Sequence, residues 1–219
     1  MIRSFAVVDC KRFVRELPRL FAKYPRSEHP RDRRFAPILA DVGGLARENN
    51  LALLNLAASL LGEGEGYVEV GSFKGLSLIA AMLGNKGDFV GIGDFSLDAG
   101  SRKLLAANLR RHGLTGHTIL EGDAFELLRG GALGQRRVGV YYYDAAHDYP
   151  SQVEGLRLIE PYLADGALMI VDDTDWDQVG RAIRDYLAGQ PRAEILVKLD
   201  GKDRGQPWWW EGVQVLRWR

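Results

Sequence analysis

Short apolar runs and amphipathic stretches alternate along this chain. Apolar or β-favouring runs occupy residues 67–70, 88–93, 118–120, 138–143 and 167–171. Between or beside them, stretches with helical spacing occupy residues 45–61, 76–83, 98–112, 151–163 and 176–187. Strands that alternate with helices are typical of β-α-β units, so the pattern predicts an α/β domain with parallel strands.

The C-terminal part of the chain breaks this alternation. Residues 194–199 and 212–218 both have strand character, and only a loop at 200–207 separates them. Two strands joined without a crossover helix pair antiparallel, so these two should form a hairpin. Trp208, Trp209 and Trp210 lie just before the second strand. They are expected either to line an acceptor pocket or to be partly buried against the sheet or a subunit interface.

The first 44 residues precede the alternating pattern and are expected to form a helical and irregular lid or oligomer arm, before a main domain at 45–219. Residues 1–34 hold ten Lys or Arg against four Asp or Glu. A nucleic-acid-binding arm is conceivable on that charge, but apolar residues recur at helical spacing from Phe13 to Tyr24, which favours the solvated face of an amphipathic helix. Pro18 should start or kink that helix.

Composition limits the classes of protein that this chain can be. Its 219 residues, 46% hydrophobic and 26% charged, suit one globular α/β domain with a sizeable core. The single cysteine, Cys10, excludes an intramolecular disulfide or a cysteine-rich metal site. No run is long enough for a membrane helix, and no secretory h-region follows the N-terminus. We therefore expect a soluble, cytoplasmic protein without a membrane or nucleic-acid partner. Whether the chain forms a homo-oligomer is left open by its composition.

The stretch from Tyr67 to Ser77 carries the first chemical signal. A strand runs into Gly71 and Gly75 and then into an apolar helical stretch. Glycines at such a turn let the backbone pass close to a ligand, and a helix start offers unpaired N–H groups. The sequence lacks the Gly-Lys-Ser/Thr of a P-loop and the Gly-x-Gly-x-x-Gly of a dinucleotide turn. The pattern indicates a cofactor-binding loop of another kind.

Residues 69–77, reading Glu-Val-Gly-Ser-Phe-Lys-Gly-Leu-Ser, resemble motif I of class I S-adenosylmethionine-dependent methyltransferases. The form is that of small O-methyltransferases of the macrocin and catechol type. The resemblance implies a Rossmann-like three-layer αβα sandwich with a mostly parallel seven-stranded sheet and an antiparallel last strand. It also implies cofactor contacts, with the acidic residue near the methionine amino group, from Glu69, Gly71, Ser72, Phe73, Gly75 and Ser77.

Two further loops are candidates for cofactor binding. Asp94 ends the strand 88–93, where a carboxylate in Rossmann-like folds accepts hydrogen bonds from ribose hydroxyls. The families resembled place their acid at the position of Gly93, so Asp94 could instead cap a helix or face solvent. Asp123 and Ala124 resemble the Gly-Asp-Ala motif that holds adenine, although an Asp at a helix start is often only an N-cap.

Carboxylates follow two strands that one helix joins. Asp144 ends the strand 138–143, and Asp172 and Asp173 end the strand 167–171, 172 − 144 = 28 residues later. One β-α-β unit spans that distance, and parallel neighbours lie about 4.8 Å apart, so Asp144 and one of the later acids can share a hard cation. Successive strand residues face opposite sides, so both later acids can bind only if the chain turns between them.

The run 144–149, Asp-Ala-Ala-His-Asp-Tyr, together with the pair Asp172 and Asp173 resembles the Asp-Gly-x-His-x-Tyr and Asp-Asp motifs of macrocin-type O-methyltransferases. The resemblance implies that Asp144, Asp172 and Asp173 bind Mg²⁺, that Asp144 also borders the cofactor, and that His147 is the general base. Ala145 replaces the usual glycine. His147 could instead support the metal without contacting it, cap a helix, or only pack against its neighbours. Asp172 could be a hydrogen-bonded turn residue and Asp173 an N-cap.

The residues and the resemblance, which covers roughly 45–218, together predict an enzyme. It would be a Mg²⁺-dependent O-methyltransferase that moves a methyl group from S-adenosylmethionine to a hydroxyl of a small molecule such as a sugar, phenol or secondary metabolite. The alternatives are a metal-independent methyltransferase and an inactive S-adenosylmethionine-binding protein. The identity of the acceptor is not encoded in any motif.

Overall fold

The computed structural model describes residues 8–98, 100–203 and 206–219. Its centre is a seven-stranded sheet with the spatial order β3-β2-β1-β4-β5-β9-β6. The strands of this sheet are β1 (Glu65–Val70), β2 (Asp88–Gly93), β3 (His117–Glu121), β4 (Arg137–Tyr143), β5 (Leu163–Asp172), β6 (Ala193–Leu199) and β9 (Val213–Trp218). A separate pair of two-residue strands, β7 (Lys202–Asp203) and β8 (Gln206–Pro207), precedes β9.

The pairing of the strands confirms the predicted topology. Strands β1 to β5 pair in parallel, and β9 pairs antiparallel with both β5 and β6. The chain order reverses between β1 and β4, and parallel α/β sheets bind ligands at the carboxyl edge beside such a reversal. The fold is therefore the predicted Rossmann-like sandwich.

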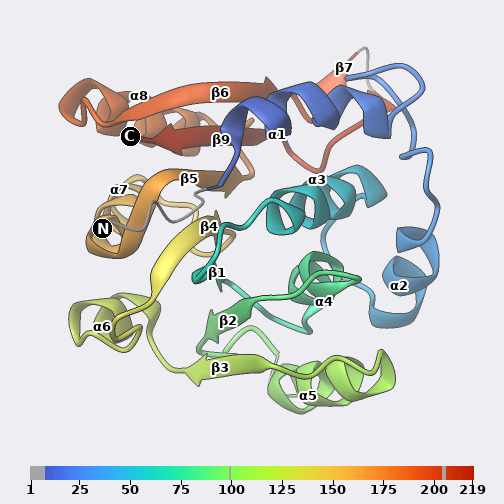
Figure 1. Ribbon diagram of the computed structural model, residues 1–219, viewed down its shortest axis with the longest axis horizontal. Coiled ribbons are helices and arrows are strands. Elements are labelled where there is room, and N and C mark those ends of the chain that lie inside the picture. The colour runs from blue at the N-terminus through green and yellow to red at the C-terminus, as the bar shows by residue number, and fades with distance from the viewer. Residues whose placement is uncertain (1–7, 99, 204–205) are drawn as a thin grey trace.

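Helices cover both faces of the sheet (Figure 1). They are α1 (Cys10–Glu16), α2 (Phe35–Val42), α3 (Glu48–Ser59), α4 (Leu76–Met82), α5 (Ser101–Arg111), α6 (Ala124–Arg129), α7 (Tyr149–Ile159) and α8 (Asp177–Gly189), with 3-10 turns η1 (Leu17–Leu20) and η2 (Glu160–Tyr162). Buried residues of α1 to α5 share one apolar cluster, and those of α6 to α8 share the other. None of the helices among the described residues is long and apolar enough to cross a bilayer.

The N-terminal helices belong to the first of these clusters. Phe13 and Leu17 are fully buried, and the N–H of Val8 donates to Glu65 Oε2 at 3.1 Å, which ties the segment to β1. Pro18 lies at the start of the 3-10 turn that follows α1, where its missing N–H leaves no helical hydrogen bond unmade. A role of this segment as a lid or oligomer arm stays a prediction.

Two local details differ from the sequence expectation. Asp148 Oδ1 accepts from the N–H of Ser151, so α7 begins at Tyr149, two residues before the expected helical stretch 151–163. The strand β5 begins at Leu163, four residues before the expected apolar run 167–171, and its register against β4 is irregular there. Neither change moves Asp144 or Asp172 from its strand end.

Candidate cofactor and cation site

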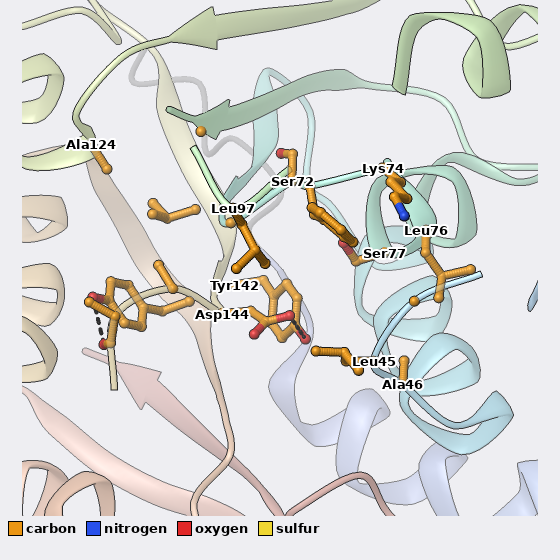
Figure 2. A pocket seen from close by; sticks show the side chains of 18 of the residues that line it. Leu45, Ala46, Ser72, Lys74, Leu76, Ser77, Leu97, Ala124, Tyr142 and Asp144 are labelled. Atoms are coloured by element: carbon orange, nitrogen blue, oxygen red, sulfur yellow. Dashed lines mark hydrogen bonds between the residues drawn. The ribbon is translucent and has the colours of Figure 1, made fainter. Parts of the chain in front are cut away.

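A cavity of about 480 Å³ opens at the carboxyl ends of β1, β2 and β4. Figure 2 shows Leu45, Leu97 and Asp144 pointing into it from separate segments of the chain, with Tyr142 beside Asp144. Its wall contains these predicted site residues: Gly71, Ser72, Phe73, Ser77, Asp94, Asp123, Ala124, Asp144, His147 and Asp173. Three predicted site residues, Glu69, Gly75 and Asp172, do not line it.

Gly71 sets the shape of the turn after β1. Its φ of +102° favours glycine, and a Cβ added there would lie 1.7 Å from the carbonyl oxygen of Asp144. The N–H groups of Gly71 and Ser72 both donate to the carbonyl of Ile92 in β2, at 2.9 and 3.2 Å. Gly71 is thus required because the ends of β1, β2 and β4 pass close together. This steric reason adds to the expectation that a glycine here lets the backbone approach a ligand.

Glu69 lies under this turn rather than in the cavity wall. Its side chain is fully buried, and Oε2 accepts from the hydroxyl of Tyr67 at 2.9 Å. Burial raises the pKa of Glu69 to about 7, although the nearby hydroxyls of Ser72, Tyr67 and Ser77 oppose the shift. The carboxyl group of Glu69 thus lies below the turn, among the hydroxyl groups of three neighbouring residues.

Asp94 and Asp123 lie at the rim of the cavity. Asp94 is exposed, and its two carboxylate oxygens accept from the N–H and the hydroxyl of Ser96, at 3.0 and 2.9 Å. Asp123 is the N-cap of α6 and accepts from the N–H of Glu126 at 2.9 Å. Each forms the local hydrogen bonds of a turn or a cap and also faces the cavity.

Asp144, His147 and Asp173 converge on the opposite wall. One ligand atom from each lies within 4.8 Å of the other two. His147 Nε2 lies 2.5 Å from Asp173 Oδ2. This contact with Asp173 raises the pKa of His147, although partial burial opposes the shift. The chain bends sharply at Asp173, whose φ of +54° is rare for a residue other than glycine.

Asp172 occupies a different environment from its neighbour. It is 2% exposed, and Oδ2 accepts from the hydroxyl of Tyr142 at 2.5 Å. The same hydroxyl lies 3.1 Å from Asp144 Oδ2, and Asn50 Nδ2 lies 3.4 Å from Asp172 Oδ1. Since the hydroxyl has one proton, it can donate to only one of the two carboxylates at a time.

Crowding of these acids makes their ionisation costly. Burial, reinforced by the carboxylate of Asp173, raises the pKa of Asp144 to about 7. Burial and the carboxylates of Asp144 and Asp173 raise the pKa of Asp172 well above its usual range. An ion of positive charge at this wall would relieve the repulsion.

Several residues of the wall were not identified from sequence. Tyr142 carries the central hydroxyl, and Asn50 links Asp172 to the N–H of Trp210, which donates to Asn50 Oδ1 at 3.0 Å. Leu45 and Leu97 are large exposed apolar side chains, at 65% and 77%, in loops that border the cavity. The sequence contains only weak signs of these roles. Asn50 is a polar residue in a mostly apolar helical stretch, and Tyr142 lies two residues before Asp144.

The three tryptophans divide between the two expected roles. Trp210 lines the cavity, while Trp209 is 1% exposed and donates through Nε1 to the carbonyl of Pro25 at 3.0 Å. The carbonyl of Trp208 accepts from Asn49 Nδ2 at 2.7 Å. Only Trp210 is thus available to contact an acceptor.

Residues 68–174 match the model of a family described as methyltransferase domain. No curated protein matches the chain. Among solved structures, an O-methyltransferase from Bacillus cereus in complex with SAH has 16% identity and a TM-score of 0.65, covering 87% of this chain and 92% of that one. The O-methyltransferase TomG from Streptomyces achromogenes, in complex with SAM, has 20% identity and a TM-score of 0.65, covering 87% and 91%.

A third solved structure, from Klebsiella pneumoniae and described as a putative O-methyltransferase, has 21% identity and a TM-score of 0.63, covering 87% and 91%. At these identities the likeness establishes the fold, and the family match covers the segment from β1 to the end of β5. That segment contains the turn at Gly71, the acids Asp94 and Asp123, and the acids Asp144, Asp172 and Asp173.

Proposed function

We propose that this chain, a class I S-adenosylmethionine-dependent methyltransferase, transfers the methyl group to a hydroxyl of a small molecule with the help of a bound divalent cation. The observation that carries the proposal is that the turn at Gly71 and the acids Asp144 and Asp173 face the same cavity. A methyl donor on one wall and a cation-bound hydroxyl on the other would then meet inside it.

The cofactor wall fits S-adenosylmethionine in its chemistry. Ser72 and Ser77 line the cavity beside the turn, and their hydroxyl oxygens are suitable acceptors for the ammonium of the methionine part. Glu69, buried below the turn, adds a carboxyl group behind these hydroxyls. Asp94 and Asp123 line the same cavity, which supports the proposed contacts to ribose and adenine.

The opposite wall fits a divalent cation through two of its three predicted ligands. Asp144 and Asp173 both face the cavity, and Asp173 Oδ1 is buried without a partner. Carboxylate oxygens are the ligands that hard divalent cations prefer. When bound, such an ion lowers the pKa of a hydroxyl that it contacts and fixes the place of that oxygen.

The chain's own residues would position the acceptor. Leu45, Leu97 and Trp210 give the cavity apolar walls that exclude water and pack against the carbon skeleton of a small molecule. Alignment of the acceptor oxygen with the methyl group can contribute several kcal/mol to catalysis. His147, predicted to take the acceptor proton, lies beside Asp144 and Asp173, a position that suits a base and equally suits an ion ligand.

The experiment is a methyl-transfer assay with labelled S-adenosylmethionine and a panel of diols, phenols and sugars. Transfer to at least one hydroxyl is expected, with loss of at least about 10²-fold when EDTA removes divalent cations and recovery when they are restored. Calorimetry should show that SAH still binds in EDTA. A rate insensitive to EDTA would favour the metal-independent alternative, and SAH binding without transfer to any acceptor would favour the inactive one.

A further inference from the structure

We infer that the cation is held by Asp144, His147 and Asp173, that Asp172 is kept off it, and that the site therefore favours transition metals such as Mn²⁺, Co²⁺ and Ni²⁺ over Mg²⁺. The inference rests on the proposed function only in its premise that a divalent cation serves the reaction. It changes the set of ligands expected from sequence, since His147 replaces Asp172.

The convergence of the three side chains is the first observation. Their ligand atoms lie within 4.8 Å of one another. Around an ion with bonds of about 2.1 Å, ligand atoms are separated by about 3 to 4.2 Å, so the three atoms need only small shifts to bind one ion. They come from two segments, the loop after β4 and the bend after β5, which the parallel pairing of these strands brings together.

An oxygen of Asp173 without a partner is the second observation. Asp173 is 6% exposed, faces the cavity, and has a buried Oδ1 without any partner among the described residues. His147 Nε2 lies 2.5 Å from the other oxygen of the same carboxylate, Oδ2. A cation bound by both residues would take the place of the proton between them, since metal ligands bind in their deprotonated form.

The contacts of Asp172 explain why it would not join them. It does not line the cavity, and its two oxygens face the hydroxyl of Tyr142 at 2.5 Å and the amide of Asn50 at 3.4 Å. Asn50 is itself fixed by the N–H of Trp210. To reach the ion, Asp172 would have to give up the short bond to Tyr142 inside the core, where an unpartnered hydroxyl costs about 1 to 3 kcal/mol.

The donor set determines which metal is preferred. Mg²⁺ prefers oxygen ligands in a nearly ideal octahedron, whereas an imidazole nitrogen suits first-row transition metals. Two carboxylates and one imidazole on one side of an ion would leave coordination positions free for the acceptor oxygen. His147 would then be a ligand of the ion and would not take the proton of the acceptor.

Binding of the metal alone, measured without turnover, tests the inference. In the wild-type protein loaded with Mn²⁺, electron spin echo envelope modulation should show a directly coordinated nitrogen. In calorimetric titrations with Ni²⁺, the variants H147A and D173N should bind at least about 10-fold more weakly than wild type, and D172N should stay within about 3-fold. Binding of SAH by each variant verifies that it is folded.

His112 provides a matched control. Its Nε2 lies 3.2 Å from Asp41 Oδ2 outside the cavity, so H112A also removes a histidine paired with an aspartate and should leave Ni²⁺ affinity unchanged. The inference is overturned if the Mn²⁺-loaded wild type shows no nitrogen coupling, or if D172N loses as much affinity as D173N. Either result leaves the proposed methyl transfer intact, because EDTA sensitivity is measured separately.

Discussion

The two walls of the cavity are built in different ways. On the wall from β1 to α4, the backbone determines the shape, since Gly71 has a positive φ and has no space for a side chain. On the wall formed by the ends of β4 and β5, side-chain charges determine the properties, since Asp144, Asp172 and Asp173 crowd together. The first wall is fixed by steric exclusion and the second by a balance of charge and hydrogen bonds.

This difference predicts how each wall responds to change. A backbone-defined wall has one acceptable geometry, so a small addition of volume should disrupt it severely. A charge-defined wall can be altered by a proton, an ion or the removal of a single hydrogen bond, and its response should depend on solution conditions.

G71A should be the most damaging substitution. Its Cβ would lie 1.7 Å from the carbonyl oxygen of Asp144 and 2.6 Å from the carbonyl carbon, both backbone atoms that cannot move independently. Overpacking and the positive φ together should lower the free energy of unfolding by about 3 kcal/mol or more. Urea unfolding measures this, with G113A as the control: Gly113 has φ +66° but no atom within 4 Å of an added Cβ. Equal losses in the two variants would contradict the steric account.

The backbone-defined wall was largely readable from sequence. Glycine spacing after an apolar run reports a steric requirement that the local chain itself imposes, so Gly71 and the strand-loop-helix turn could be predicted. The alternation of strands and helices likewise fixes a parallel sheet, because few topologies satisfy it. The bend that joint binding by Asp172 and Asp173 would require is present, with φ +54° at Asp173.

The charge-defined wall was predictable only as a set of nearby acids. Which acid faces the cavity depends on Tyr142 from β4 and on Asn50 from α3, and these partners lie 30 and 122 residues from Asp172 in the chain. No local pattern reports such a contact. The apolar lining at Leu45 and Leu97 was missed for a similar reason, because loop residues acquire a role only when the fold places them beside a cavity.

Raising the pH should destabilise the protein in the absence of divalent cations. Burial raises the pKa of both Glu69 and Asp144 to about 7, and that of Asp172 also rises, so each binds its proton more tightly in the folded chain. Unfolding then releases protons between about pH 4 and 7, and the free energy of unfolding falls with pH across that window. The raised pKa of His147 acts in the same direction above its ordinary value of 6.5, because its contribution is lost as pH rises.

Urea unfolding in EDTA at pH 5 and pH 7.5 measures this effect. We expect a loss of at least about 2 kcal/mol at the higher pH, a smaller loss in D144N, and recovery of stability on adding Mn²⁺. Carboxylates with a lowered pKa, such as those of Asp41 and Asp98, change stability only in more acid solution, so they do not interfere. Stability that is constant or rises over this interval would contradict the charge-defined character of the wall.

D94A should have the smallest effect, because Asp94 lies at the rim of the cavity and its hydrogen bonds within the protein are local. Asp94 is exposed and already accepts two bonds from Ser96, so the fold should lose less than about 1 kcal/mol. If Asp94 accepts from the ribose hydroxyls, SAH should bind about 10-fold more weakly, and the 2′-deoxy analogue of SAH should bind wild type and variant with more similar affinity. D98A is the control, since Asp98 is exposed on the same loop but lies outside the cavity wall. Unchanged binding of SAH in D94A would remove Asp94 from the ribose contact and leave it a turn residue.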